Sequence, residues 1–250
     1  SLRTWTVLER ASADYHLNER VGWILNEVLA EVTQAIHVQA IDSQSPNLAT
    51  SFAKFFSAVR SHIDPNNAHE AELTLSEGGY FTAFLGCELA QRAANIDRPA
   101  DDAPEADRAT YASRRLSLSR CLANIGRHDE ALKAVREATA LCRILAEQNP
   151  AAHTPDLAMA LSNLADSLDN NGRQHEALTT AQEATSLYRT LVKHNPAAHT
   201  PNLAMSLNNL ANYLDSNRRQ REALTTAQEA TNLYRTLVKH NPAAHTPNLA

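Results

Sequence analysis

The sequence predicts an all-α solenoid, a right-handed superhelix of stacked antiparallel helix pairs. Three observations favour this fold class. Residues 151–196 and 197–242 are 46-residue copies that differ at nine positions and agree at the other 37, and a fixed period of this length is typical of repeat proteins. Apolar residues recur within each copy at helical spacing. The 250 residues include only 6 Gly and 10 Pro, which argues against disorder and is compatible with a folded chain.

The first helix of each copy is expected to begin at Thr154 and to end at Asn171-Gly172. Threonine is a good cap, and Pro155 suits the first helical position because its missing N–H costs no hydrogen bond there. Glycine adopts the left-handed conformation that ends helices. Arg218 replaces this glycine in the second copy, at an expected cost of roughly 1 kcal/mol. The apolar face of the helix contains Leu157, Leu161, Leu164, Ala165 and Leu168.

A second helix is predicted from about Gln174 to His194, with Pro196 just after its end. Its small alanines allow another helix to approach closely. One such helix pair cannot bury its own apolar face, whereas stacked copies bury a continuous core. The apolar face of this helix contains Ala177, Leu178, Ala181, Ala184, Leu187, Tyr188 and Leu191.

The predicted organisation has three parts. Residues 1–63 form an amino-terminal helical segment, residues 64–104 a degenerate helical repeat with an acidic linker, and residues 105–250 the repeat array. Because the chain begins with Ser and stops eight residues into a new copy, we expect it to be part of a longer protein. The units of the array are about 105–150, 151–196 and 197–242, with the start of the next at 243–250.

The amino-terminal part is expected to contain one long amphipathic helix over residues 14–41 and a second one that starts at Ser45-Pro46. A break follows at Pro65, and Gly78-Gly79 takes the turn of the degenerate repeat. The cluster Phe52, Phe55 and Phe56 is interpreted as core. The alternative is a docking face for a neighbouring domain.

The array resembles the tetratricopeptide repeat, through the spacing of Leu161, Leu164, Ala165, Leu168, Gly172, Ala177 and Ala184. The motif SLNNLA at 206–211, preceded by HTPNLA, is similar to the kinesin-light-chain type of this repeat and to long arrays in bacterial and fungal signalling proteins. The resemblance covers about residues 105–250. It implies that the first helix of each unit lines a concave groove, where Asn163 and Asn209 would hydrogen-bond the backbone of a bound peptide.

The differences between the two copies support this groove. Three of the nine form a stripe along the first helix, at Ser162/Asn208, Asp166/Asn212 and Asn170/Ser216. A solvated polar face that is free to vary would give the same pattern. Two methionines stand where the chaperone-binding members of the family carry basic residues, so we do not expect a carboxylate clamp. The candidate groove residues are Arg120, Met159, Ser162, Asn163, Asp166, Asp169, Asn170, Met205, Asn208, Asn209, Asn212 and Asp215, with Met159, Met205 and Tyr213 as possible anchors.

Composition and motifs argue against several other classes of protein. The net charge of −5 differs from the basic charge typical of nucleic-acid binders. No apolar run reaches the roughly 18 residues that span a membrane. Three widely spaced cysteines, Cys87, Cys121 and Cys142, favour free thiols and a cytoplasmic location. His194 and His199 lack the further ligands of a metal site, and no catalytic or phosphate-binding motif is found. We therefore predict neither cofactor, metal nor enzymatic activity.

The sequence is most compatible with a non-catalytic module that binds a protein or peptide, as the scaffold or sensor arm of a larger protein. The mildly acidic groove favours basic or amide-rich ligands. Two alternatives remain open. The chain could be the regulatory arm of a signal-transducing nucleoside triphosphatase or protease, or an array that self-associates through exposed repeat ends.

Overall fold

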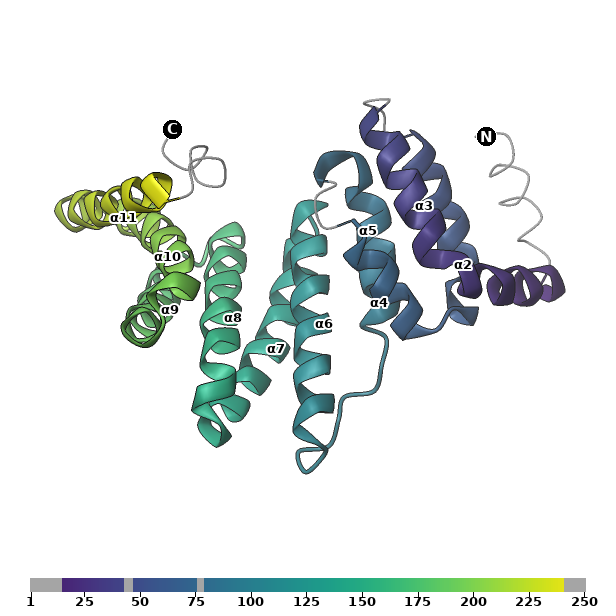
Figure 1. Cartoon of the computed structure of the whole chain (residues 1–250), viewed down its shortest axis with the longest axis horizontal. Coiled ribbons are helices and arrows are strands. Elements are labelled where there is room, and N and C mark those ends of the chain that lie inside the picture. The colour runs from purple at the N-terminus through teal and green to yellow at the C-terminus, as the bar shows by residue number, and fades with distance from the viewer. Residues whose placement is uncertain (1–14, 43–46, 76–78, 241–250) are drawn as a thin grey trace. The chain divides into compact units, whose positions relative to one another are not determined.

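The computed structural model describes residues 15–42, 47–75 and 79–240, whose regular elements are all helices (Figure 1). The all-α fold class that the sequence predicts is confirmed. Among the described helices, none is long and apolar enough to cross a membrane. The start of a further copy at 243–250 lies outside the described residues, as do Ser45-Pro46 and Gly78. The elements are α2 (Tyr15–Asp42), α3 (Asn47–Val59), the 3-10 helix η1 (Arg60–His62), α4 (Pro65–Leu73), α5 (Gly79–Ala93), α6 (Glu105–Asn124), α7 (His128–Gln148), α8 (Pro150–Asn170), α9 (Gln174–His194), α10 (Pro196–Ser216) and α11 (Gln220–His240).

The chain divides into two compact units between Ala131 and Leu132, inside α7. In the amino-terminal unit, α2 packs against α3 and α4, and α5 packs against α3, α4 and α6. Phe52, Phe55 and Phe56 lie at the centre of this unit, each at most 1% exposed. The ring of Phe52 lies 6.2 and 6.5 Å from the other two rings. The interpretation of these phenylalanines as core is confirmed, and a docking face is excluded because it would need exposed rings.

Residues 64–104, predicted as a degenerate repeat with a linker, contain the helices α4 and α5. Asp64 caps α4, because its carboxylate accepts a hydrogen bond of 2.7 Å from the backbone N–H of Asn66, and Pro65 occupies the first turn. Residues 94–104 then connect α5 to α6 through turns and irregular backbone.

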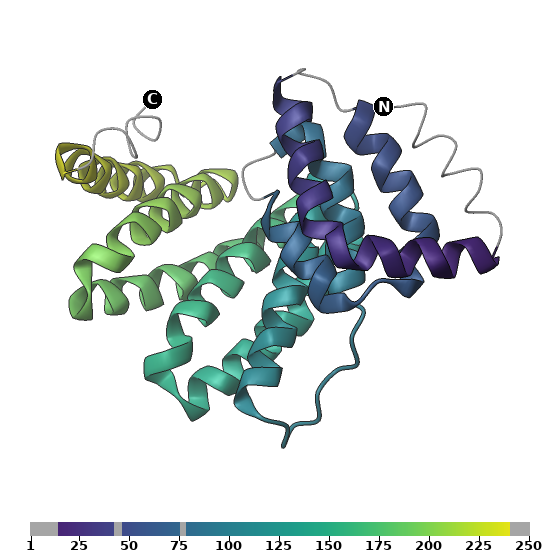
Figure 2. The same ribbon diagram turned by 45° about the vertical axis from the view of Figure 1, so that its right-hand side comes forward.

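The carboxyl-terminal unit contains the two close copies, folded as the helix pairs α8/α9 and α10/α11 (Figure 2). Consecutive helices of these pairs pack against each other, and α9 also packs against α10. Alanines contribute to the buried faces of these helices: Ala158, Ala184 and Ala204 are fully buried and Ala230 is 2% exposed. These small side chains let the helix backbones approach closely, so each pair buries a face that it could not bury alone.

The first helices begin about one turn earlier than the sequence predicts. Helix α8 is capped by Asn149, whose side chain accepts a hydrogen bond from the N–H of Ala152, and α10 is capped in the same way by Asn195. The prediction of a cap at Thr154 is therefore wrong. Thr154 lies within α8, and its hydroxyl donates to the carbonyl oxygen of Pro150 at 2.6 Å. The first helical position is occupied by Pro150 and not by Pro155, contrary to the prediction. Pro155 lies beyond the first four N–H groups, so its missing N–H removes one hydrogen bond from the helix.

The first helices end as predicted, in residues with positive φ. Gly126, Gly172 and Arg218 have φ angles of 79°, 72° and 61°. The backbone N–H of Arg173 then donates to the oxygen of Leu168, five residues earlier, at 2.9 Å. The same bond recurs in the other copies, so each turn has the Schellman geometry. The prediction that Arg218 adopts the left-handed conformation is confirmed.

Candidate functional site

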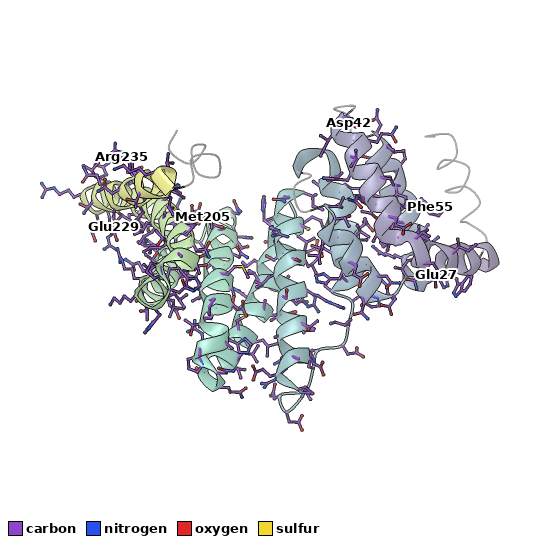
Figure 3. The ribbon with its side chains drawn as sticks, viewed as in Figure 1. Glu27, Asp42, Phe55, Met205, Glu229 and Arg235 are labelled. Carbon is purple, nitrogen blue, oxygen red and sulfur yellow. The ribbon has the colours of Figure 1, made fainter. Side chains whose placement is uncertain are left out.

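The candidate site lies on the first helices of the two close copies. Met159 on α8 and Met205 on α10 occupy equivalent positions and are 45% and 51% exposed, and Met205 is labelled in Figure 3. Exposed methionines at matching positions stand out because the neighbouring apolar positions of both helices are buried. We call these two methionines, together with the polar side chains near them on α8 and α10, the first-helix surface. It comprises Met159, Ser162, Asn163, Asp166, Asp169, Asn170, Met205, Asn208, Asn209, Asn212 and Asp215.

Three residues of this region form a polar contact between the two copies. The hydroxyl of Tyr213 on α10 donates to Oδ1 of Asp166 on α8, and Nδ2 of Asn209 lies 3.5 Å from the same oxygen. Burial raises the pKa of Asp166, with the charge of Asp169 adding to the effect and the Tyr213 hydrogen bond opposing it. Burial together with the charge of Asp166 raises the pKa of Tyr213. The contact therefore joins α8 of one copy to α10 of the next and keeps the half-buried carboxylate of Asp166 within the first-helix surface.

The remaining predicted residues differ in how accessible they are. Asn208, Asn212 and Asp215 on α10 are exposed. On α8, Asn170 is exposed and three residues are half-buried, namely Ser162, Asn163 and Asp169. The hydroxyl of Ser162 donates to the carbonyl oxygen of Ala158 at 3.1 Å. A ligand on this surface would therefore meet mainly the methionines and the side chains of α10.

Two predicted positions stand apart from this set. Tyr213 is only 7% exposed, and its hydroxyl is engaged by Asp166. The prediction that it anchors a ligand is wrong, because its side chain packs between helices. Arg120 is exposed on α6, in the amino-terminal unit, and its role in a groove stays a prediction.

The cysteines lack the features of reactive thiols. Cys87 and Cys142 are buried, Cys121 is half-buried, and all three are free. Burial raises the pKa of Cys121 and of Cys142 to about 12. Only the thiolate is a good nucleophile, so these groups are poorly reactive at neutral pH. Among the described residues, no three His, Cys, Asp or Glu side chains are placed to hold a metal ion.

Sequence reasoning missed a cavity in the amino-terminal unit, of about 440 Å³ and lined by arginines. Its lining comes from η1, α5, α6, the first turn of α7 and the segments that follow α5 and α6. Arg127 and Glu130 recur in the other copies as Arg173/Glu176 and Arg219/Glu222, whereas Arg60 and Arg92 lie outside the repeats. Only the proximity of several arginines to one another marks the site, and that is visible only in the folded chain.

The comparisons with known proteins agree with this architecture. Residues 157–198 and 203–244 match the sequence profile of the tetratricopeptide repeat. Among proteins with curated descriptions, none matches the chain. A crystal structure from Podosopora anserina, described as kinesin light chain nearly identical TPR-like repeats, is 14% identical with a TM-score of 0.53 and covers 90% of this chain and 98% of its own. A variant of that protein gives 14% identity, a TM-score of 0.55, and coverage of 89% and 98%. At this level of identity the likeness concerns the fold.

Proposed function

Because residues 157–198 and 203–244 match the tetratricopeptide repeat, we propose that the chain is a non-catalytic module that binds another protein or a peptide. It would act in the cytoplasm as the scaffold or sensor arm of a larger protein. Stacked helix pairs present long surfaces that suit extended ligands. The proposal concerns binding by shape and hydrogen bonding, with no chemical step.

The observation that carries the proposal is the matched exposure of Met159 and Met205. Each keeps about half of its side-chain surface in solvent, although apolar neighbours on the same helices are buried. Methionine is flexible and polarisable, and it is common on surfaces that adapt to their ligands. Two such side chains, repeated at the period of the array, are suited to act as apolar anchors for one extended ligand.

Polar side chains beside the methionines favour a particular ligand chemistry. Asn208 and Asn212 carry exposed amides, which can donate to and accept from a peptide backbone. Asp215 adds an exposed carboxylate on the same helix. We therefore expect a peptide segment with basic or amide-rich side chains and an apolar residue for each methionine.

The test compares three baits in affinity capture from host lysate, followed by titration of each captured partner as a purified protein. The baits are the wild type, Met159→Glu/Met205→Glu and the matched control Gln182→Glu/Gln228→Glu. The control adds the same charge at equivalent exposed positions of the second helices α9 and α11. Circular dichroism checks that both variants remain helical.

We expect the methionine variant to weaken binding at least tenfold, because it places two charges where apolar contacts form. A tenfold loss of affinity corresponds to about 1.4 kcal/mol of binding free energy. The control should bind as the wild type does. Equal binding by all three baits would place the site elsewhere on the chain. Failure to capture any partner would contradict the proposal that the chain is a binding module.

Self-association is a second candidate, favoured by one observation. Leu224 on α11 is 62% exposed, whereas the equivalent Leu178 on α9 is 6% exposed. An exposed leucine at a position that packing otherwise covers could bind a second copy. Light scattering over a range of concentrations tests this, and Leu224→Gln should abolish any concentration-dependent increase in mass. A constant monomeric mass would contradict it.

A further inference from the structure

The cavity of about 440 Å³ in the amino-terminal unit has a strongly cationic lining. Four arginines contribute to it: Arg60 from η1, Arg92 near the end of α5, Arg115 from α6, and Arg127 between α6 and α7. The single acidic residue of the lining is Glu130. The whole chain has a net charge of −5, whereas the lining of this cavity carries more positive than negative side chains.

Each of these arginines is held in place by a contact within the unit. Nη1 of Arg60 donates to Glu88 at 2.9 Å and to Gln91 at 3.2 Å. The Nε and Nη2 groups of Arg127 donate to the two carboxylate oxygens of Glu130 at 2.7 and 2.6 Å. A guanidinium group has five N–H donors, so such contacts orient the group and still leave it able to bind an anion.

Arg92 and Arg115 each donate a hydrogen bond to an uncharged oxygen. The Nε of Arg92 donates to the carbonyl oxygen of Ile63. Arg115 donates to the hydroxyl of Tyr111 at 3.0 Å, and its guanidinium carbon lies 5.0 Å from the centre of that ring. Burial lowers the pKa of Arg92, against the opposing charge of Asp64, which indicates that its charge is incompletely compensated. An anion in the cavity would supply this compensation.

The charges of the site favour a negatively charged ligand. Four guanidinium groups line the cavity, and Glu130 contributes one carboxylate to the same lining. Arginine recognises carboxylate and phosphate oxygens through paired N–H groups, so a ligand with acidic groups of either kind is matched.

The size and the rest of the lining suggest a small organic molecule. Pockets for small ligands usually enclose about 300–1,000 Å³, and this cavity lies within that range. Leu118 and Leu122 supply an apolar wall, and the amides of Gln91 and Asn95 supply further hydrogen-bonding groups. Such a lining suits a compact carbon skeleton that carries acidic groups.

We propose that this cavity binds a small organic anion, whose carboxylate or phosphate groups contact Arg60, Arg92, Arg115 and Arg127. The site lies in the amino-terminal unit and takes a small molecule, so it is separate from the peptide-binding surface of α8 and α10. It would give the chain a means of responding to a metabolite.

Isothermal titration calorimetry of the full chain at about physiological ionic strength tests the proposal. The probes are succinate and citrate for carboxylates, glycerol 3-phosphate and inorganic phosphate for phosphates, glycerol as the neutral control, and an acidic hexapeptide. The variants are Arg60→Gln and Arg127→Gln, whose side chains are 43% and 42% exposed. Arg98→Gln is the matched control, because Arg98 is an exposed arginine of the same unit that does not line the cavity.

We expect at least one small anion to bind and glycerol not to bind. Arg60→Gln and Arg127→Gln should each weaken binding about tenfold, because each removes one charge-assisted hydrogen bond to the anion. Arg98→Gln should leave the affinity unchanged. Preference between the carboxylates and the phosphates identifies the chemistry of the acidic groups, and either preference supports the proposal.

Three results would overturn the proposal. The first is that none of the small anions binds to the wild type. The second is an equal loss of affinity in Arg98→Gln, which would show that binding reflects general charge attraction. The third is binding of the hexapeptide alone, which would assign the cavity to an acidic protein segment. The methionine variant of the first-helix surface should bind the small anion as the wild type does, so failure of one proposal leaves the other intact.

Discussion

At the residue scale, two of the differences between the close copies prove to be structural partners. Asp166 and Asn212 occupy equivalent positions, as do Ser167 and Tyr213. The structure brings Asp166 of one copy against Tyr213 of the next, where the hydroxyl donates to the carboxylate. The variation at these positions therefore has a packing reason as well as a possible ligand-binding one. A freely varying solvated face does not account for this pair.

This contact predicts a pH-dependent effect of Asp166→Asn, the residue found at position 212. Burial raises the pKa of Asp166 above its ordinary value of 3.8, so the folded chain holds the proton more tightly than the unfolded chain does. The wild type should therefore lose stability as the pH rises through the range just above 3.8. We expect Asp166→Asn to raise the free energy of unfolding at pH 7, and to raise it less as the pH falls towards 4.

Urea unfolding, followed by circular dichroism at several pH values, measures this difference. Asp215→Asn removes an exposed carboxylate from α10 and controls for the loss of one negative charge. A variant that is less stable than the wild type at pH 7, by the same amount at every pH, would contradict the prediction. It would mean that the hydrogen bond from Tyr213 outweighs the cost of burying the charge.

At the scale of the element, the sequence predicts where helices end better than where they begin. Gly172 and its equivalent Arg218 are local signals, because a residue with positive φ is enough to end a helix. The beginnings were misjudged because Thr154-Pro155 and Asn149-Pro150 are both good start signals. The helix begins at Asn149-Pro150, and the hydroxyl of Thr154 donates a hydrogen bond to the carbonyl oxygen of Pro150 within the helix.

The ion pairs between second helices could not be predicted in the same way. Arg143 on α7 pairs with Glu183 on α9 at 2.6 Å, and Arg189 on α9 pairs with Glu229 on α11 at 2.7 Å. Both pairs join residues 40 positions apart. This spacing becomes a contact only once the stacking of the helices is known.

The turn after α10 predicts a stabilising substitution. Arg218 has a φ of 61°, a conformation that costs a residue with a side chain about 1 kcal/mol more than glycine. Arg218→Gly should therefore raise the free energy of unfolding by up to about 1 kcal/mol. Thermal or urea unfolding of the full chain measures the change.

The equivalent turn after α8 provides the reverse substitution. An added Cβ at Gly172 would meet no atom within 4 Å, so Gly172→Ala tests the backbone alone. We expect it to destabilise the chain by about 1 kcal/mol. If both substitutions left the stability unchanged, the φ angles of these turns would not determine it, and the assignment of strain to Arg218 would be incorrect.

At the scale of the whole molecule, the period of the sequence predicts the repeats and the surface of their first helices, but not the amino-terminal site. Met159 and Met205 were found because they recur. The arginine-lined cavity combines residues of the repeat unit 105–150 with residues of η1 and α5, which lie outside the repeats. Its position depends on how η1, α5 and α6 pack together, which local patterns do not encode. Function in such a chain is therefore easiest to predict where the sequence repeats.

The repetition also places one sequence in two environments. Residues 177–185 of α9 and 223–231 of α11 have the same sequence. Leu178 is 6% exposed and its equivalent Leu224 is 62% exposed, while Ala181 is 4% exposed and Ala227 is half-buried. Helix α9 packs against both α8 and α10, whereas α11 packs against α10. The two segments therefore have the same intrinsic helix propensity, and they differ only in the helices that pack against them.

This pair predicts that α11 opens at a lower free energy than α9 in the 250-residue chain. Burying a leucine side chain contributes about 1.5–3 kcal/mol, so amide hydrogens in α11 should exchange at least about tenfold faster than those in α9. Mass spectrometry can separate the two copies through peptides that include His175 or Arg221. Measurements at low concentration keep self-association from protecting Leu224. Equal exchange in the two helices would instead mean that α8 to α11 open as one cooperative block, in which stacking transmits stability across repeats regardless of local burial.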